Sequence, residues 1–574
     1  MMIRDTIQKN IFSAIVAAQK EGALPVFSLS AIPLEHPDTV AYGDYTTSIA
    51  LQLAKSVGKP PRAIAECIVT ALQKQHSAAI DRIEIADAGF INMWLSEDWL
   101  RSTVQAIVQH PKTFARRTIG KGKRVIVELS SVNIAKEMNI GHFRSNIIGD
   151  ALAFFYEALG YKVIRDNHLG DWGTQFGKLI VATRQWIATT GKTVDDVTLP
   201  LLMQLYVQFH KDAENDPALD DAARRETKKL QDGDQENRKL WKRFVALSLA
   251  EFQSIYDRLG TKFDTMHGES FYNDMLAGVV ADARTKGVAK ESEGALIIPF
   301  ETLPPAIIQK SDGAFNYATT DLATIQYRAK TYKPFRTLYC VANEQALHFN
   351  QLFAAATALG YKNTGELVHV KFGMALGADG KKFSTRRGET IRLLDVMNEA
   401  VARARRLVTA EDMTEKEKDA IAEIVGIGAL KYNDLSQNRV HDITFDWDRM
   451  LSITGNSAPY LQYVAVRIRG ILEKAPQEKG RGIADAWTDE ERMLARLLYR
   501  FSEVIEDAAN AYEPHRLAEY LFELAQAFHR FYDKVSVLKA DPATRNERLH
   551  LITAVRHTII EGLRLLGIGT PERM

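Results

Sequence analysis

Residues 128–150, ELSSVNIAKEMNIGHFRSNIIGD, carry the most information about the fold of this chain. The β-branched run at residues 125–127 immediately before them is typical of a buried parallel strand. After Ile140 the apolar residues recur at helical spacing, so a helix is expected to begin there. A strand, a short loop and a helix N-terminus form the unit with which α/β proteins hold phosphate groups, because the first helical N–H groups have no partner within the helix.

Three residues of this segment suit a nucleotide site. Gly141 allows the backbone to approach a ligand closely. His142 offers a hydrogen-bond donor beside it, and Lys136 supplies a positive charge. By itself, a glycine at the start of a helix is equally compatible with ordinary packing.

The composition indicates a globular protein of more than one domain. The 574 residues are 46% apolar and 25% charged, and the formal net charge is +1. A polyanionic partner would therefore have to bind to local basic patches, because the net charge of the whole protein is too small to attract it. The only cysteines, Cys67 and Cys340, are far apart, which argues against disulfides and against a protein-bound zinc site. We find no signal-peptide pattern or membrane span, so a cytoplasmic protein is expected.

The pattern along the chain predicts three domains. Residues 1–112 read as a small α+β domain with strands at 82–85 and 90–94 and helices at 45–57 and 63–72. Residues 113–400 alternate strands and helices, which predicts an α/β doubly wound parallel sheet with strands at 125–127, 162–165, 336–340 and 367–372. This domain contains a charged helical insertion near 195–300, whose most charged part is expected to be an exposed helical face. Residues 401–574 are almost wholly helical in pattern.

Two further segments carry candidate chemistry. In residues 379–390, DGKKFSTRRGET, glycines and basic residues fit a phosphate clamp, although a solvated basic loop has the same composition. In residues 315–324, FNYATTDLAT, Tyr317 and Asp321 are four apart and share a helix face. A carboxylate and an aromatic ring suit a guanidinium ligand, while the simpler alternative is that Asp321 supports a helix N-terminus.

In combination these segments resemble the arginyl enzymes of the class I aminoacyl-tRNA synthetases. Residues 128–150 are similar to the first signature of that family, SxNIAKxMHxGHxRS, and residues 382–386 to an altered form of its second, Lys-Met-Ser-Lys-Ser. The second lysine of that pattern is Thr385 here, and members that lack it carry a lysine at the position of Lys136. Asn139 stands in place of the first signature histidine, and it can donate a hydrogen bond but cannot carry charge.

The resemblance implies a class I Rossmann-type catalytic domain, an N-terminal α+β domain that binds the tRNA elbow and an all-α anticodon-binding domain. It assigns catalysis to Lys136, His142, Lys382 and Arg386, and ATP binding to Asn139, Gly141, His142, Lys136, Lys382 and Ser384. It assigns arginine binding to Glu128, Asn133, Tyr317, Asp321, Gln345 and His348. Contacts with tRNA are expected from Phe90, Asn92, Tyr460, Arg467, Tyr532 and Met574.

The expected function is that of an arginine–tRNA ligase, which activates L-arginine with ATP and esterifies the terminal adenosine of its tRNA. Mg²⁺ is expected to arrive with ATP, with no metal bound by the protein itself, and the resemblance favours a monomer that has no membrane partner. The alternative is a non-catalytic synthetase-like protein that binds tRNA, supported only by Asn139 and Thr385. A synthetase of the cysteinyl type is excluded because its zinc-ligand cysteines are missing.

Overall fold

The computed structural model describes residues 2–29, 31–86, 88–377, 380, 391–409, 411–476 and 486–574. These residues form two compact units. The first consists of Met1–Arg117, Leu461–Ala508 and Glu519–Gly562, and the second of Thr118–Tyr460, Ala509–Ala518 and Leu563–Met574. The chain therefore passes repeatedly between the two units, and the three-domain division made from the sequence stays a prediction.

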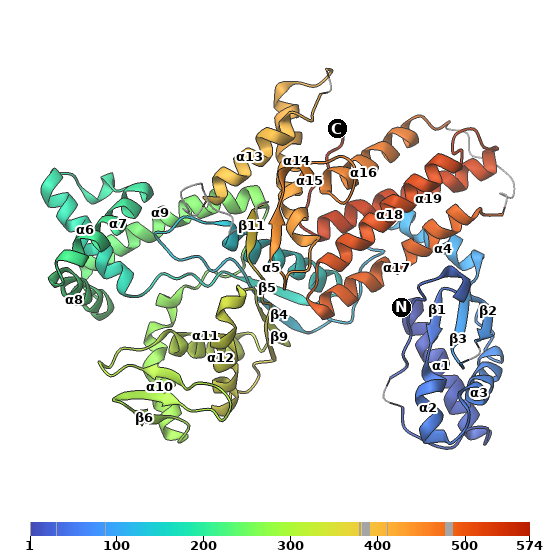
Figure 1. Ribbon diagram of the computed structural model, residues 1–574, viewed down its shortest axis with the longest axis horizontal. Coiled ribbons are helices and arrows are strands. Elements are labelled where there is room, and N and C mark those ends of the chain that lie inside the picture. The colour runs from blue at the N-terminus through green and yellow to red at the C-terminus, as the bar shows by residue number, and fades with distance from the viewer. Residues whose placement is uncertain are drawn as a thin grey trace. The chain divides into compact units, whose positions relative to one another are not determined.

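The N-terminal part of the first unit is a three-stranded antiparallel sheet in the order β1-β3-β2, with helices packed beside it (Figure 1). Its centre is β3, which has a strand on either side and in which every residue is buried. The elements are α1 (Ile3–Lys20), η1 (Val40–Tyr42), β1 (Tyr45–Thr47), α2 (Ile49–Val57), α3 (Pro61–Gln73), β2 (Ile80–Ile85), β3 (Ile91–Leu95) and α4 (Glu97–Gln109).

The strands expected at 82–85 and 90–94 are β2 and β3. The helix expected at 45–57 is wrong for its first three residues, which form strand β1 instead. There Thr46 pairs through its backbone with Glu35 and lies opposite Asn92 in the sheet. A sheet partner from elsewhere in the chain thus overrides the local helical spacing.

Four long helices make up the rest of the first unit for most of their lengths: α16 (Ala458–Glu473), α17 (Asp489–Ala511), α18 (His515–Lys534) and α19 (Pro542–Leu565). Figure 1 shows them side by side in orange and red. Their buried faces are apolar, with Leu494, Leu524 and Val555 at most 1% exposed. Gly562 of α19 packs directly on Leu521 of α18, where a Cβ atom would lie 2.4 Å from the leucine side chain.

The second unit is built on a four-stranded, all-parallel sheet in the order β10-β9-β4-β5. All four strands expected from the sequence are present: β4 (Arg124–Glu128), β5 (Lys162–Asp166), β9 (Arg336–Tyr339) and β10 (Glu366–His369). Helices flank this sheet: α5 (Ile140–Ala158), α11 (Tyr317–Thr331) and, after η4 (Asn343–Gln345), α12 (Ala346–Ala358). This is the parallel α/β arrangement that the alternating pattern predicts.

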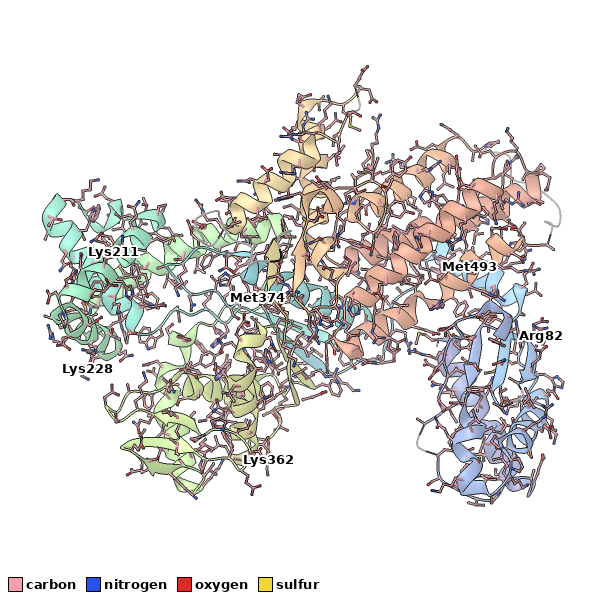
Figure 2. All side chains as sticks on the ribbon, viewed as in Figure 1. Arg82, Lys211, Lys228, Lys362, Met374 and Met493 are labelled. Carbon is pink, nitrogen blue, oxygen red and sulfur yellow. The ribbon has the colours of Figure 1, made fainter. Side chains whose placement is uncertain are left out.

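A long excursion between β5 and β9 carries the remaining elements of the central region. It contains α6 (Thr174–Thr190), η2 (Val194–Asp196), α7 (Leu199–Asn215), α8 (Ala218–Asp232), α9 (Gln235–Leu259), η3 (Glu269–Met275), α10 (Leu276–Thr285) and the small sheet of β6 (Lys290–Ser292), β7 (Ala295–Ile298) and β8 (Ala306–Gln309). The charged stretch is helical, and its exposed lysines Lys211 and Lys228 are labelled in Figure 2.

After β10 the second unit continues through β11 (Ala375–Gly377), α13 (Leu393–Arg405), α14 (Glu415–Leu435), β12 (Ile443–Phe445) and α15 (Trp447–Met450). Residues 509–518 and 563–574 return to this unit and bond to α14. The hydroxyl of Tyr432 donates to the carbonyl of Ala518 at 3.0 Å, and the ammonium of Lys431 donates to the carbonyls of Leu259 and Gly567, each at 2.6 Å. Met574 packs against a small apolar cluster that includes Val425.

No helix within the described ranges is both long and apolar enough to cross a membrane.

Candidate active site

The loop between β4 and α5 is held in an unusual backbone conformation. Ser130, Ser131 and Ala135 all have positive φ angles, of 73°, 49° and 60°. Such angles are costly for residues other than glycine and persist only where surrounding contacts enforce them. Those contacts come from three directions. The N–H of Ser130 donates to Ser145 of α5 at 3.0 Å, that of Ser131 to Asn167 after β5 at 3.1 Å, and that of Ala135 to Ser248 of α9 at 2.9 Å.

Asn139 is the N-cap of α5. Its Oδ1 atom accepts from the N–H groups of Gly141 at 2.9 Å and His142 at 3.3 Å. A side chain outside the helix therefore satisfies both N–H groups in this structure, and the assignment of ATP binding to Gly141 and His142 stays a prediction. The atom that Asn139 retains for a ligand is its amide nitrogen Nδ2, a donor.

His142 completes the capping box, because its Nδ1 accepts from the backbone N–H of Asn139 at 3.1 Å. An accepting Nδ1 places the ring proton on Nε2. Burial, with Lys136 as a second cause, lowers the pKa of His142 to about 4. His142 is therefore neutral at physiological pH and offers an Nε2–H donor.

Asp321 lies at the centre of the second group of site residues, in the first turns of α11. Nε2 of His348 is 2.7 Å from its Oδ2, and Nε2 of His168 is 3.8 Å from its Oδ1. The ring of Tyr317, which is 57% exposed, lies 4.7 Å from the ring of His348. Asp321 does not cap α11, because the N-cap is Asn316, whose side chain accepts from the N–H of Tyr317. The helix-cap alternative for Asp321 is thus excluded.

Glu269 of η3 is a second carboxylate close to Asp321 and His168, and no motif in the sequence pointed to it. Burial raises the pKa of Glu269 to about 7. The nearby His168 lowers this pKa, whereas the carboxylates of Asp321 and Asp171 raise it. Asp171 holds the segment that carries Glu269, since its carboxylate accepts from the N–H and the hydroxyl of Ser270 at 2.8 and 2.6 Å.

Glu128 ends β4 and is 6% exposed. Its Oε2 accepts from Nη2 of Arg328, on α11, at 2.6 Å. The same Nη2 donates to Asp166 at the end of β5. Glu128 is therefore fixed by a buried guanidinium that no sequence pattern had indicated.

The other expected site residues are distributed as follows. Asn133 and Lys136 are exposed on the loop after β4, and Gln345 is exposed at the end of η4, after β9. These positions follow the carboxyl ends of the parallel strands, where such sheets bind ligands. Lys382, Ser384 and Arg386 lie outside the described residues. Among the described residues, no group of three or more His, Cys, Asp and Glu side chains could hold a metal ion.

Comparisons with known proteins match the whole chain. The family model for the catalytic domain of class I (R) tRNA synthetases matches residues 103–447. The arginine–tRNA ligase of Fusobacterium nucleatum is 40% identical to this chain, and the match covers 96% of this chain and 97% of that protein. The arginine–tRNA ligase of Azotobacter vinelandii is also 40% identical, and the match covers 100% of both chains. The chain belongs to the arginyl-tRNA synthetase family.

Models of the family's N-terminal domain and of the DALR anticodon binding domain match residues 3–95 and 461–574. Among solved structures, the arginyl-tRNA synthetase of Plasmodium falciparum superposes with a TM-score of 0.84 at 25% identity, covering 100% of this chain and 99% of that one. The enzyme of Thermus thermophilus has a TM-score of 0.82 at 25% identity, with 100% of both chains covered.

The residues expected to contact tRNA in this family member differ in accessibility. Phe90 is 38% exposed, whereas Asn92 is 6% exposed and accepts from the Thr46 hydroxyl at 2.7 Å. Tyr460 is 8% exposed, so a base cannot stack on its ring in this structure. The guanidinium of Arg467 lies 4.3 Å from the ring centre of Tyr532, which is half-buried. Met574 lies instead in the apolar cluster of the second unit.

Proposed function

We propose that the protein is an arginine–tRNA ligase that activates L-arginine with ATP and transfers it to the terminal adenosine of its tRNA. The observation that carries the proposal is the carboxylate of Asp321, which lies beside His168 and His348, next to the exposed ring of Tyr317 and close enough to the second carboxylate, Glu269, to raise its pKa. Two carboxylates and an aromatic ring complement the charge and the plane of a guanidinium. Relatives with this activity match the chain over its full length.

The reaction needs no nucleophile from the protein. The carboxylate of arginine attacks the α-phosphorus of ATP, pyrophosphate leaves, and a hydroxyl of the terminal tRNA adenosine then displaces AMP. The protein supplies positioning and positive charge where negative charge develops on the phosphate oxygens. We assign this role to Lys136, Lys382 and Arg386, together with the Nε2–H of neutral His142. Mg²⁺ enters as the ion bound to the ATP phosphates.

Arginine is selected at both of its ends. Asp321, oriented by His348, takes the guanidinium together with Glu269 and Tyr317. Glu128 ends β4, and Asn133 and Gln345 follow strands β4 and β9. These three residues are assigned to the α-amino and carboxylate groups.

RNA binding is assigned to the first unit. Unpaired RNA bases are commonly bound by stacking on aromatic rings and guanidinium planes, and the stacked pair of Tyr532 and Arg467 presents both. Exposed Phe90 is assigned to the tRNA elbow. We further infer that the protein acts as a monomer, and in the cytoplasm, where aminoacylated tRNA is used. A single-subunit mass in light scattering would support the first inference, and a dimer would contradict it.

The test is arginine-dependent ATP–pyrophosphate exchange, with and without tRNA, followed by tRNA arginylation. Asp321→Asn should weaken transition-state binding of arginine by about 2–5 kcal/mol, because a neutral amide leaves the guanidinium poorly paired. Asp282→Asn is the matched control, since the Asp282 side chain is 28% exposed against 26% for Asp321 and pairs with a surface lysine. Unchanged arginine kinetics in Asp321→Asn would remove this residue from the site.

The same assay judges the non-catalytic alternative. A protein that only binds tRNA would show no exchange and no arginylation, even with tRNA present. Its two supporting residues do not require that result, because Asn139 keeps a donor and Lys136 replaces the charge missing at Thr385.

A further inference from the structure

Arg328 belongs to none of the motifs in the sequence, yet it is a buried charged group that pairs with the site residue Glu128. It is 2% exposed and lies seven residues after Asp321 on α11. Seven residues are close to two helical turns, so both side chains leave the same face of α11, about 10 Å apart along its axis. Arg328 therefore lies on the same face of α11 as Asp321, the residue proposed to bind the guanidinium of the substrate, and two turns further along the helix.

Two carboxylates surround this single guanidinium. Nη2 of Arg328 donates both to Oε2 of Glu128 at 2.6 Å and to Oδ2 of Asp166. Asp166 uses its other oxygen as well, because Oδ1 accepts from the hydroxyl of Thr265. Glu128 differs, since its Oε1 receives no hydrogen bond from any residue that the structure describes.

The charges of this cluster do not balance. One guanidinium against two carboxylates leaves one negative charge enclosed by protein, a costly arrangement unless a further cation completes it. Asp166 has no free oxygen for such a cation, whereas Glu128 has one. Glu128 also ends a strand of the parallel sheet, at the edge where ligands bind.

We propose that Arg328 is a positioning residue for arginine recognition: it holds Glu128 so that the free Oε1 receives the α-ammonium group of the substrate. This inference rests on the proposed function and adds a specificity element to the same site. Through Arg328, one helix then serves both ends of the substrate, because α11 also carries Asp321. The α-ammonium group supplies the cation that the buried cluster lacks.

The experiment compares three ligands by equilibrium calorimetry on the full chain. L-Arginine has both α-groups, agmatine keeps the amine but lacks the carboxylate, and δ-guanidinovalerate keeps the carboxylate but lacks the amine. In Arg328→Met the affinities for L-arginine and agmatine should fall at least about tenfold, the worth of a hydrogen bond to a charged group. The affinity for δ-guanidinovalerate should stay within about twofold of the unaltered protein.

Two further variants separate positioning from folding. Glu128→Gln should reproduce the selective loss with Arg328 intact. Asp166→Asn is the control, because it alters the same buried cluster but keeps the contact between Arg328 and Glu128, and it should leave the ratio of the three affinities unchanged. Arg328→Lys replaces Arg328→Met if the latter does not fold.

An equal loss of all three ligands in the Arg328 variant, or failure of both Arg328 variants to fold, would make Arg328 a structural residue and overturn the proposal. Selective loss in the Arg328 variant without any in Glu128→Gln would overturn it too, because Glu128 would not be the group that binds. These outcomes differ from failure of the proposed function, in which the unaltered protein itself would neither bind L-arginine nor catalyse its exchange.

Discussion

At the scale of single residues, we expect Glu269 to couple arginine binding to the release of a proton. Burial raises the pKa of Glu269 to about 7, Asp321 and Asp171 add to the rise and His168 opposes it, so the carboxyl group is about half protonated at neutral pH and largely protonated about one pH unit lower. A bound guanidinium favours the carboxylate form and displaces that proton. Arginine affinity should therefore rise with pH, by up to about tenfold per unit, and level off above neutrality.

Calorimetry in buffers of different ionisation enthalpy would measure the proton released on binding, and Glu269→Gln should release none. The same pH dependence in that variant would assign the proton to another group. The effect of rising pH on stability is opposite to its effect on arginine affinity. The folded protein binds this proton more tightly than the unfolded chain, so Glu269 lowers the free energy of unfolding as pH rises from about 4.5 to about 7.

Lys136 is expected to act on the phosphate chemistry and not on arginine. Lys136→Ala should slow adenylate formation by about 100-fold or more, because it removes a positive charge that stabilises the negative charge developing on the phosphate oxygens in the transition state. The affinity for arginine should change little, because the lysine is not assigned to the arginine site. Lys136→Arg is the charge-preserving control, and adding Thr385→Lys to the alanine variant should restore part of the rate. The pKa of His142, about 4, should also rise in Lys136→Ala, which an NMR titration would detect. A fully active alanine variant would contradict the assignment.

At the scale of elements, the N-terminus of α5 is capped by Asn139, and we expect the same residue to face the bound ATP. Asn139→Ala should lower the free energy of unfolding by about 1 kcal/mol, because the N–H groups of Gly141 and His142 lose their acceptor. Asn139→Asp should keep that stability, since aspartate caps equally well, but should slow adenylate formation by placing negative charge beside the ATP phosphates.

Asn139→Ser separates the two effects, because it caps without charge. Chemical denaturation and single-turnover adenylation on the three variants would measure both quantities. If the aspartate variant kept the full rate, Asn139 would not face the phosphates.

The elements also show how far local sequence signals reach. The four parallel strands and helix α5 follow from apolar spacing and short-range motifs, and they are present as expected. Strand β1 was missed because its identity depends on the backbones of Glu35 and Asn92, which are distant in sequence. Glu269 and Arg328 were missed for the same physical reason: each gains its surroundings from carboxylates on other elements, and neither lies in a recognisable motif.

At the scale of the whole molecule, tRNA recognition should be separable from catalysis. Tyr532→Ala should raise the apparent Michaelis constant for tRNA, because stacking of one base on an aromatic ring contributes about 1–3 kcal/mol. Arginine-dependent exchange should change little under the same conditions. Tyr532→Phe retains the ring above which Arg467 lies and is the matched control. A variant that melts at lower temperature but binds tRNA normally would show that Tyr532 only supports the helices.

The limits of inference from sequence differ again at this scale. Tyr460 and Tyr532 both occur in helical patterns, yet one is 8% exposed and the other is half-buried under a guanidinium. Helical spacing identifies which face of a helix is apolar, but it does not show whether a polar-tipped aromatic residue on that face meets a neighbouring helix or solvent.

The return of residues 509–518 and 563–574 to the second unit has a consequence for protein synthesis. Backbone carbonyls of these segments accept hydrogen bonds from Tyr432 and Lys431 of α14. All other residues of the second unit precede these segments in the chain. The ribosome synthesises residues 118–460 of the second unit first and adds residues 509–518 and 563–574 only later. The second unit is therefore incomplete during most of translation, and in a chain that stops before residue 567 the Lys431 ammonium keeps the carbonyl of Leu259 but lacks that of Gly567. A cell that recognises incompletely folded chains could in this way remove a prematurely terminated product before it reached the tRNA pool.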